Sequence, residues 1–90
     1  MELDPTDMRK VATRLTRAQG QLAAVVRMLD EGRDCEDVVT QLSAVSRALD
    51  RAGFAIIASG MRQCLTEPTA DGEDPTLDVA KLEKLFLSLA

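Results

Sequence analysis

The sequence predicts an all-α fold with three helices in a single domain that spans residues 1–90. Three observations lead to this prediction. No segment alternates apolar and polar residues as a half-buried strand does. Apolar residues recur instead at helical spacing, in two long stretches and one short one. Proline and glycine stand at the points that separate these stretches.

The first predicted helix begins after Asp4, a favourable N-cap residue, with Pro5 at the first helical position. Asp7 stands where a capping box places its acidic residue. Gly32 is expected to end the helix as a C-terminal cap. An apolar seam with seven-residue spacing runs between these ends, through Met8, Leu15, Leu22 and Leu29, with Val11 or Ala12, Ala18, and Val25 or Val26 between them.

The second predicted helix starts at Asp34 and has to end before Pro68. Gly53 and Gly60 lie inside it, and each costs roughly 1 kcal/mol relative to alanine. Either they permit close backbone approach, or the helix breaks near Gly60. Its apolar face is formed by Val38, Leu42, Val45, Leu49, Ala52 and Ile56.

Residues 66–75 are predicted to form a loop, after which Pro75 opens a short third helix. The apolar face of this helix comprises Leu77, Leu82, Leu85, Phe86 and Leu89. The whole chain has two Phe and no Trp or Tyr. Long helices with so few aromatic residues usually share a core with other chains, so we expect a homo-oligomer.

The N-terminus has no apolar run typical of a secretory signal, and no stretch approaches a membrane span. We therefore expect a cytoplasmic protein that does not associate with a membrane. Two cysteines in a reducing cytosol are unsuited to a structural disulfide. They can be metal ligands, redox-active thiols or buried packing residues.

The net charge is −4, yet residues 8–29 contain five basic residues and no acidic one. Four polar residues of this segment follow helical spacing and share one face: Lys10, Arg14, Arg17 and Gln21. Such a stripe suits a phosphate backbone, and it equally suits a solvated helix face.

The cysteines, Cys35 and Cys64, are 29 residues apart on the second predicted helix. On a continuous helix this spacing places the two side chains within about 20° of the same direction around the axis. It also separates the thiols by roughly 40 Å along the axis. An antiparallel second copy would bring Cys35 of one chain near Cys64 of the other, twice by symmetry. A helix N-terminus favours an anion, so Cys35 is expected to be the nucleophile and Cys64 the resolving thiol.

The chain contains no histidine, which excludes Ser–His and Cys–His activation of a nucleophile. No glycine-rich phosphate loop follows a strand. The sequence therefore predicts that the protein is not an enzyme.

Residues 14–52 and 58–65 resemble the copper-sensing operon repressor (CsoR) family. The resemblance is carried by an R-L-x-R-x-x-G-Q run, an R-M-hydrophobic turn, a cysteine shortly after it and a Q-hydrophobic-S-A-hydrophobic run. In this chain these elements are Arg14-Leu15-Thr16-Arg17-Ala18-Gln19-Gly20-Gln21, Arg27-Met28-Leu29, Cys35, and Gln41-Leu42-Ser43-Ala44-Val45.

The resemblance implies a homodimer built as an antiparallel four-helix bundle, with dimers pairing into a homotetramer. It also implies a repressor that binds double-stranded operator DNA through a basic surface and releases it when an effector reacts at the cysteines. By position, Arg14 and Arg51 match the family's DNA-contacting arginines. Arg9, Lys10 and Arg17 are expected to extend that surface.

Three departures from the copper-sensing pattern point to a different effector. Gly60 stands where copper sensors carry a histidine ligand, while Asp34 and Lys84 stand where they carry an outer-shell Tyr and Glu. Because the chain keeps both cysteines and lacks that histidine, it is similar to the persulfide-sensing (CstR-like) branch of the family. The formaldehyde-sensing and nickel- or cobalt-sensing branches require histidine, which the chain lacks.

The sequence thus predicts a repressor with no metal or cofactor, in which reactive sulfur species link Cys35 and Cys64 of two chains by a di- or polysulfide. One alternative is a sensor of Cu(I) or another thiophilic metal that uses Cys35 and Cys64 as ligands. A second alternative is a helical interaction module that binds a protein partner and no DNA.

Overall fold

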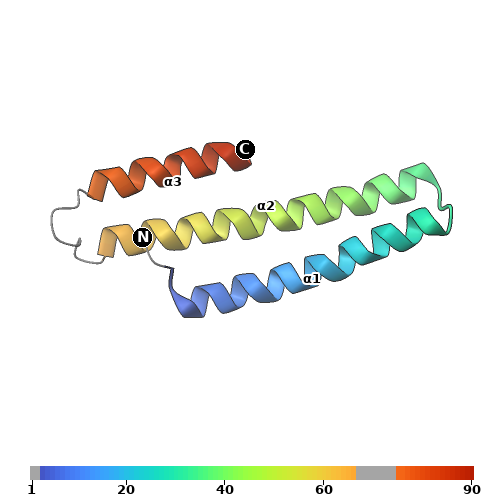
Figure 1. The fold of residues 1–90 in the computed structure, drawn as a ribbon, viewed down its shortest axis with the longest axis horizontal. Coiled ribbons are helices and arrows are strands. Elements are labelled where there is room, and N and C mark those ends of the chain that lie inside the picture. Colours follow the sequence, from blue (N-terminus) through green and yellow to red (C-terminus); the bar gives the residue numbers. More distant parts are fainter. Residues whose placement is uncertain (1–2, 67–74) are drawn as a thin grey trace.

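The computed structural model describes residues 3–66 and 75–90, without the side chains of residues 64–66 and 75–78. It consists of α1 (Pro5–Asp30), α2 (Cys35–Thr66) and α3 (Pro75–Leu89). The helices lie side by side with α2 in the middle, and the described residues contain no strand (Figure 1). The prediction of an all-α fold with three helices is confirmed.

Both ends of α1 follow the local signals in the sequence. The Asp4 carboxylate accepts a hydrogen bond from the backbone N–H of Asp7 at 3.0 Å, and Pro5 occupies the first turn. At the other end, Gly32 adopts a φ of 68°, a left-handed conformation that favours glycine. The backbone N–H of Arg33 then reaches back to the carbonyl of Met28 at 2.9 Å, which closes the helix.

The α2 helix is continuous from Cys35 to Thr66, so the alternative of a break near Gly60 is wrong. The two internal glycines make room for leucine side chains of α3. A methyl group at Gly53 would lie 2.6 Å from Leu89 Cδ1, and one at Gly60 would lie 3.2 Å from Leu82 Cδ2. The predicted close approach is therefore made by side chains and not by another backbone.

The core between α1 and α2 is a ladder of small residues at seven-residue spacing. Its buried members are Val11, Ala18 and Val25 of α1 and Val45 and Ala52 of α2. Small side chains let the two antiparallel helices approach closely along their length. Of the predicted seam on α1, these small residues are covered within the chain, whereas the larger Leu22 and Leu29 are 46% and 62% exposed.

Among the described residues, the third helix packs against α2 and not against α1, through the buried Leu82 and a ring contact between Phe54 and Phe86 with centroids 5.1 Å apart. The predicted face of α3 is confirmed in part, because Leu85 is half exposed and the Leu77 side chain lies outside the described residues. The molecule measures 57 × 24 × 13 Å. A helix with side chains is roughly 10–12 Å thick, so the chain is a single layer of helices.

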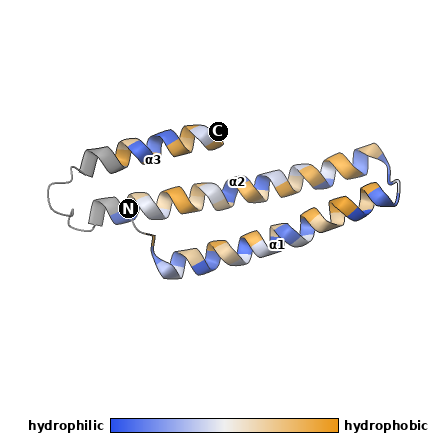
Figure 2. Cartoon of the chain, in the orientation of Figure 1, coloured by the Kyte–Doolittle hydropathy of each residue, from blue (hydrophilic) through white to orange (hydrophobic). Residues whose placement is uncertain are grey.

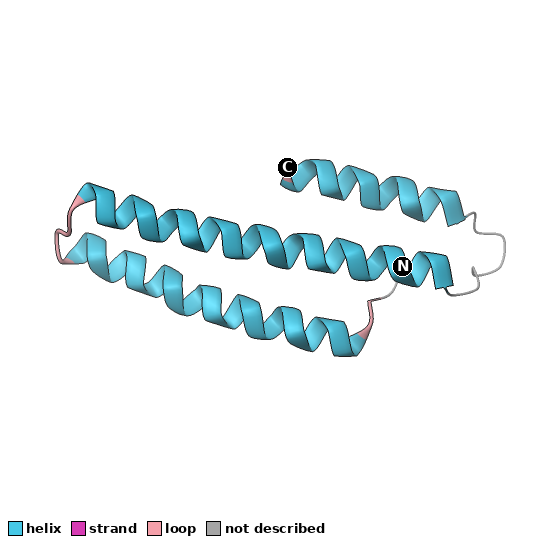
Figure 3. Cartoon of the chain, turned by 180° about the vertical axis from the view of Figure 1, so that it is seen from behind, coloured by secondary structure: helices cyan, strands magenta, loops and turns pink. Residues whose placement is uncertain are grey.

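A single layer leaves two broad faces uncovered. Apolar residues recur along all three helices (Figure 2), and several large ones are exposed. None of the described helices combines the length and the apolar character that a membrane crossing requires. Viewed from behind, α1 and α2 form one long hairpin whose tight connection lies at the far end from α3 (Figure 3). Cys35 begins α2 at that connection.

Candidate nucleic-acid interface and cysteine site

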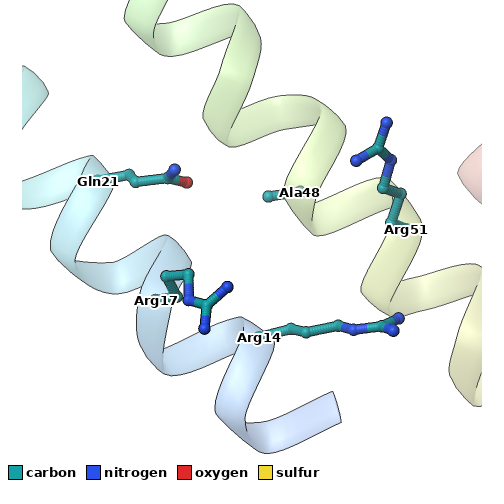
Figure 4. Close-up of a pocket in the computed structure, with 5 residues that line it drawn as sticks. All are labelled: Arg14, Arg17, Gln21, Ala48 and Arg51. Atoms are coloured by element: carbon teal, nitrogen blue, oxygen red, sulfur yellow. The ribbon is translucent and has the colours of Figure 1, made fainter. Parts of the chain in front are cut away.

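Three of the predicted DNA-contacting residues meet at a hollow between α1 and α2. This hollow, which we call the basic groove, has a volume of about 370 Å³ and is lined by Arg14, Arg17, Gln21, Ala48 and Arg51. The side chains from α1 extend toward α2, where the small Ala48 leaves space (Figure 4). No acidic side chain lines the groove, so it presents three positive charges to a ligand.

A second hollow, of about 150 Å³, adjoins the basic groove because Arg14 lines both. Its remaining lining residues are Asp7, Lys10, Val11, Ala55 and Arg62. Lys10 therefore lies where the sequence predicts, next to Arg14 on the same helix face.

Arg9 lines neither of these two hollows. Its Nη2 atom donates to Thr6 Oγ1 at 3.4 Å, along the exposed surface of α1. One residue corresponds to a rotation of about 100° around a helix, which turns Arg9 away from Lys10. A direct role for Arg9 in DNA contact remains a prediction.

Asp7 joins the start of α1 to the second half of α2, an arrangement that the sequence did not predict. Its Oδ2 atom accepts hydrogen bonds from Ser59 Oγ and Arg62 Nη2, both at 2.9 Å. Asp7 thus makes half of the expected capping box, since its N–H bonds to Asp4 while its carboxylate turns to α2. We call Asp7, Ser59 and Arg62 the polar clamp.

The sequence does contain a signal for the polar clamp. Ser59 follows Val45 and Ala52 at seven-residue spacing, so it occupies a core position, and it is completely buried. A buried hydroxyl needs a hydrogen-bond partner, because an unpaired one costs roughly 1–3 kcal/mol. Its partner is 52 residues away in sequence, which is why local patterns do not identify it.

Hydrogen bonds from Arg62 and then Ser59 lower the pKa of Asp7 below its usual value of 3.8, although desolvation opposes this. The positive charges of Arg62 and Lys10 lower it further. The clamp therefore favours the ionised carboxylate.

Replacing Asp7 with Asn is expected to lower the Tm at neutral pH, and the difference from wild type should shrink as the pH falls below 3.8. The lowered pKa in the folded state means that the carboxylate stabilises the fold above 3.8 and loses this effect as it protonates. Thermal unfolding between about pH 7 and about pH 2 measures the difference. Glu83→Gln, which removes an exposed carboxylate of α3, is the control. A Tm difference independent of pH would contradict the ionic role of Asp7.

The two cysteines lie on one continuous helix. Cys35 is exposed and is the first residue of α2, whose N-terminus is capped by Asp34 through a 3.1 Å bond from the N–H of Glu36. The backbone of Cys64 belongs to the last turn of α2. At 1.5 Å per residue the two positions are roughly 40 Å apart, so one chain cannot bring them together.

The surroundings of Cys35 are acidic. Arg33, the nearest cation in sequence, forms ion pairs with Glu31 at 4.0 Å and Asp37 at 3.8 Å. Its positive charge is therefore shared with carboxylates. Among the side chains that the structure describes, no three that could hold a metal ion lie together.

Exposed apolar side chains of α1 and α2 form a strip beside Cys35. This apolar stripe comprises Leu22, Val26, Leu29, Val39, Leu42 and Leu49. At 100° per residue, the stripe lies to one side of the α1–α2 contact and the basic groove lies to the other side. The helical layer thus has one apolar face and one basic face.

Two sequence relatives have names that describe copper sensing. The copper-sensing transcriptional repressor RicR of Mycobacterium tuberculosis is 38% identical over 61 residues, covering 68% of this chain and 64% of RicR. The copper-sensing transcriptional repressor CsoR of Mycobacterium ulcerans is 33% identical over 87 residues, covering 90% of this chain and 74% of the relative. The chain thus spans just under two thirds of RicR.

Two solved structures have a similar fold. A variant of the formaldehyde-responsive regulator FrmR from Salmonella enterica serovar Typhimurium superposes with a TM-score of 0.81 at 22% identity, covering 97% of this chain and 98% of FrmR. The nickel-responsive transcriptional regulator InrS superposes with a TM-score of 0.76 at 29% identity, covering 100% and 98%. The FrmR likeness shows the fold alone.

The family comparison covers nearly the whole chain. Residues 7–88 match the family described as metal-sensitive transcriptional repressor. The matched range includes the lining residues of both hollows and both cysteine positions. Its members regulate transcription and are not enzymes. This chain belongs to the metal-sensitive transcriptional repressor family.

Proposed function

We propose that this repressor binds operator DNA through the basic groove and releases it when Cys35 becomes linked to Cys64 of a second copy by reactive sulfur species. The observation that carries the proposal is the continuous α2 helix, which holds both cysteines on one side but roughly 40 Å apart. Only a second chain can bring these thiols together.

The basic groove supports DNA binding. Arg14, Arg17 and Arg51 come from two helices and line one hollow without an acidic neighbour. Guanidinium groups form charge-assisted hydrogen bonds with phosphate oxygens, frequently two at a time. Contacts of this kind position a protein on the duplex and make its affinity depend on salt.

The apolar stripe supports a homodimer. A two-fold axis that places Cys35 beside Cys64 of the partner has to pass near residue 49, because that position is midway between them. Leu49 is 47% exposed in the single chain, and the axis would pack it against its own copy. Antiparallel pairing of two α1–α2 hairpins through this face would build a four-helix bundle, and such dimers would pair into a tetramer.

The reaction needs a sulfane sulfur as oxidant. The Cys35 thiolate attacks the terminal sulfur of an organic persulfide, which releases the organic thiolate and leaves a persulfide on Cys35. The partner's Cys64 thiolate then attacks Cys35 Sγ, expelling hydrosulfide and forming the disulfide. A second persulfide equivalent would give the trisulfide by the same exchange.

Cu(I) is the second candidate effector, favoured by the copper-sensing names of RicR and CsoR. Cys35 and the partner's Cys64 would hold the ion, because soft thiolates suit Cu(I). Against this, Gly60 provides no third ligand at the position where copper sensors have histidine. The absence of histidine also disfavours the nickel and formaldehyde responses for which InrS and FrmR are named.

Gel-shift titration with DNA from the protein's own promoter region, before and after treatment with an organic persulfide, tests the proposal. Treated protein should lose DNA affinity and show, by mass spectrometry without reductant, covalent dimers with zero or more added sulfur atoms. Release by Cu(I) but not by persulfide would replace the effector with the metal. A protein that ignores the DNA at low salt would indicate the interaction module instead.

Replacing Cys35 with Ala is expected to abolish the persulfide response and the covalent dimer while leaving DNA affinity unchanged. Cys35 is exposed and remote from the basic groove, so its removal should not disturb the fold. Cys64→Ala should also prevent the cross-link.

Mixing the two variants provides the decisive control. A Cys35→Ala chain paired with a Cys64→Ala chain keeps one Cys35 and one Cys64 across the dimer, so persulfide should again yield a covalent dimer. If the mixture stays monomeric on a non-reducing gel while wild type cross-links, the pairing of Cys35 with the partner's Cys64 is wrong.

A further inference from the structure

The row of cations on the basic face continues beyond the basic groove. On α2, Ala48, Arg51, Ala55 and Arg62 follow spacings of three, four and seven residues, so they share one helix face. The short side chains of the two alanines leave space on this face, and the longer arginine side chains line that space. Arg62 lines the second hollow together with Lys10 and Arg14.

The polar clamp holds the Arg62 side chain against α1. Its Nη2 atom donates to Asp7 Oδ2 at 2.9 Å, and the same oxygen accepts from the fully buried Ser59. A buried hydroxyl fixes the carboxylate, and the carboxylate in turn fixes the guanidinium. The Arg62 side chain nevertheless remains 61% exposed, so a ligand over the second hollow can reach it.

A fixed guanidinium loses less conformational freedom when it binds than a mobile one does. Ordering one long side chain at an interface costs roughly 0.5–1.5 kcal/mol, and preorganisation removes part of that cost. Exposed ion pairs are usually weak, whereas the carboxylate of this one also accepts a hydrogen bond from the buried Ser59 hydroxyl. The clamp therefore acts on the orientation of Arg62.

We infer that Arg62 is a further phosphate contact of the proposed DNA-binding surface and that Asp7 is a residue that positions it. This inference rests on the proposed binding of DNA. It extends the surface along α2 to a point two residues before Cys64. The DNA contact and the resolving cysteine would then lie within one turn of the same helix.

Replacing Arg62 with Gln tests the contact through the salt dependence of DNA affinity. Removing one phosphate-binding cation should reduce the slope of log affinity against log salt by about 0.9. Between 50 and 200 mM salt, the affinity of the variant should therefore fall about 3.5-fold less than that of wild type. Arg62→Lys keeps the charge and should retain the wild-type slope.

Arg33→Gln removes an exposed arginine in the connection between α1 and α2, at the opposite end of the hairpin, and is the matched control. It should leave the slope unchanged. Circular dichroism and the Tm verify that each variant is folded. An Arg62→Gln slope equal to wild type, or an equal change in Arg33→Gln, would overturn the contact while leaving DNA binding intact. Wild-type protein that binds no DNA would overturn the inference and the proposed function together.

The positioning role is tested by combining Asp7→Asn with Arg62→Gln. Asp7→Asn removes a negative charge beside Lys10 and Arg14 in both backgrounds, so the positioning role is measured by how much more it changes DNA affinity and slope when Arg62 is present than when it is absent. A non-zero coupling in the slope is not expected of a residue that only stabilises the fold. Equal effects of Asp7→Asn in both backgrounds would show that Asp7 does not act through Arg62.

Discussion

Replacing Arg14 and Arg51 together with Gln is expected to weaken operator binding by about 100-fold or more. These two side chains come from different helices and line the same groove. Hydrogen bonds to charged groups contribute roughly 1.5–3 kcal/mol each, so removing two is worth about 3 kcal/mol or more. Gel-shift or fluorescence-anisotropy titration at fixed salt measures the change in Kd.

The double variant Arg27→Gln, Arg33→Gln is the matched control, because it removes the same total charge from exposed positions outside the basic groove. Its effect on Kd should be small, since only the overall electrostatic attraction changes. If both double variants weaken binding equally, net charge governs the affinity and the basic groove is not the DNA-binding surface.

Replacing Leu49 with Asp is expected to convert the proposed dimer into monomers. Leu49 is the exposed apolar residue closest to the proposed two-fold axis, so two new carboxylates would meet in an apolar interface. Removing such ions from water without a partner costs several kcal/mol each. Sedimentation velocity should therefore show a single monomeric species at concentrations where wild type is oligomeric, and persulfide should no longer produce covalent dimers.

Ser43→Asp adds the same charge to an exposed position on the outer side of α2, outside the apolar stripe, and should remain dimeric. A dimeric Leu49→Asp protein would show that the chains associate through another surface. The pairing of Cys35 with the partner's Cys64 would then lose its geometric basis.

The helices and their ends were predictable because their causes are local. Asp4, Pro5 and Gly32 act on backbone groups a few residues away, and each performs the predicted role. The meeting of Arg14 and Arg17 with Arg51 required only that the two long helices pack as an antiparallel hairpin.

What sequence reasoning missed depends on contacts between distant residues. Asp7 suggested a helix cap, yet its carboxylate binds Ser59 and Arg62, more than 50 residues away. The sequence also did not show which row of the α1 seam packs against α2, because the leucine row and the row of smaller residues both have seven-residue spacing. Only the packed hairpin shows that Val11, Ala18 and Val25 face α2 while Leu22 and Leu29 face outward.

The 13 Å thickness of the molecule bears directly on how a signal could travel. In a layer one helix deep, the proposed dimer surface and the proposed DNA-binding surface are opposite faces of the same two helices, α1 and α2. A rotation or shift of α2 imposed at the apolar face would displace the side chains on its basic face by a similar amount. A signal that crosses such a layer needs no relay of intermediate residues, because the same helix carries side chains on both faces.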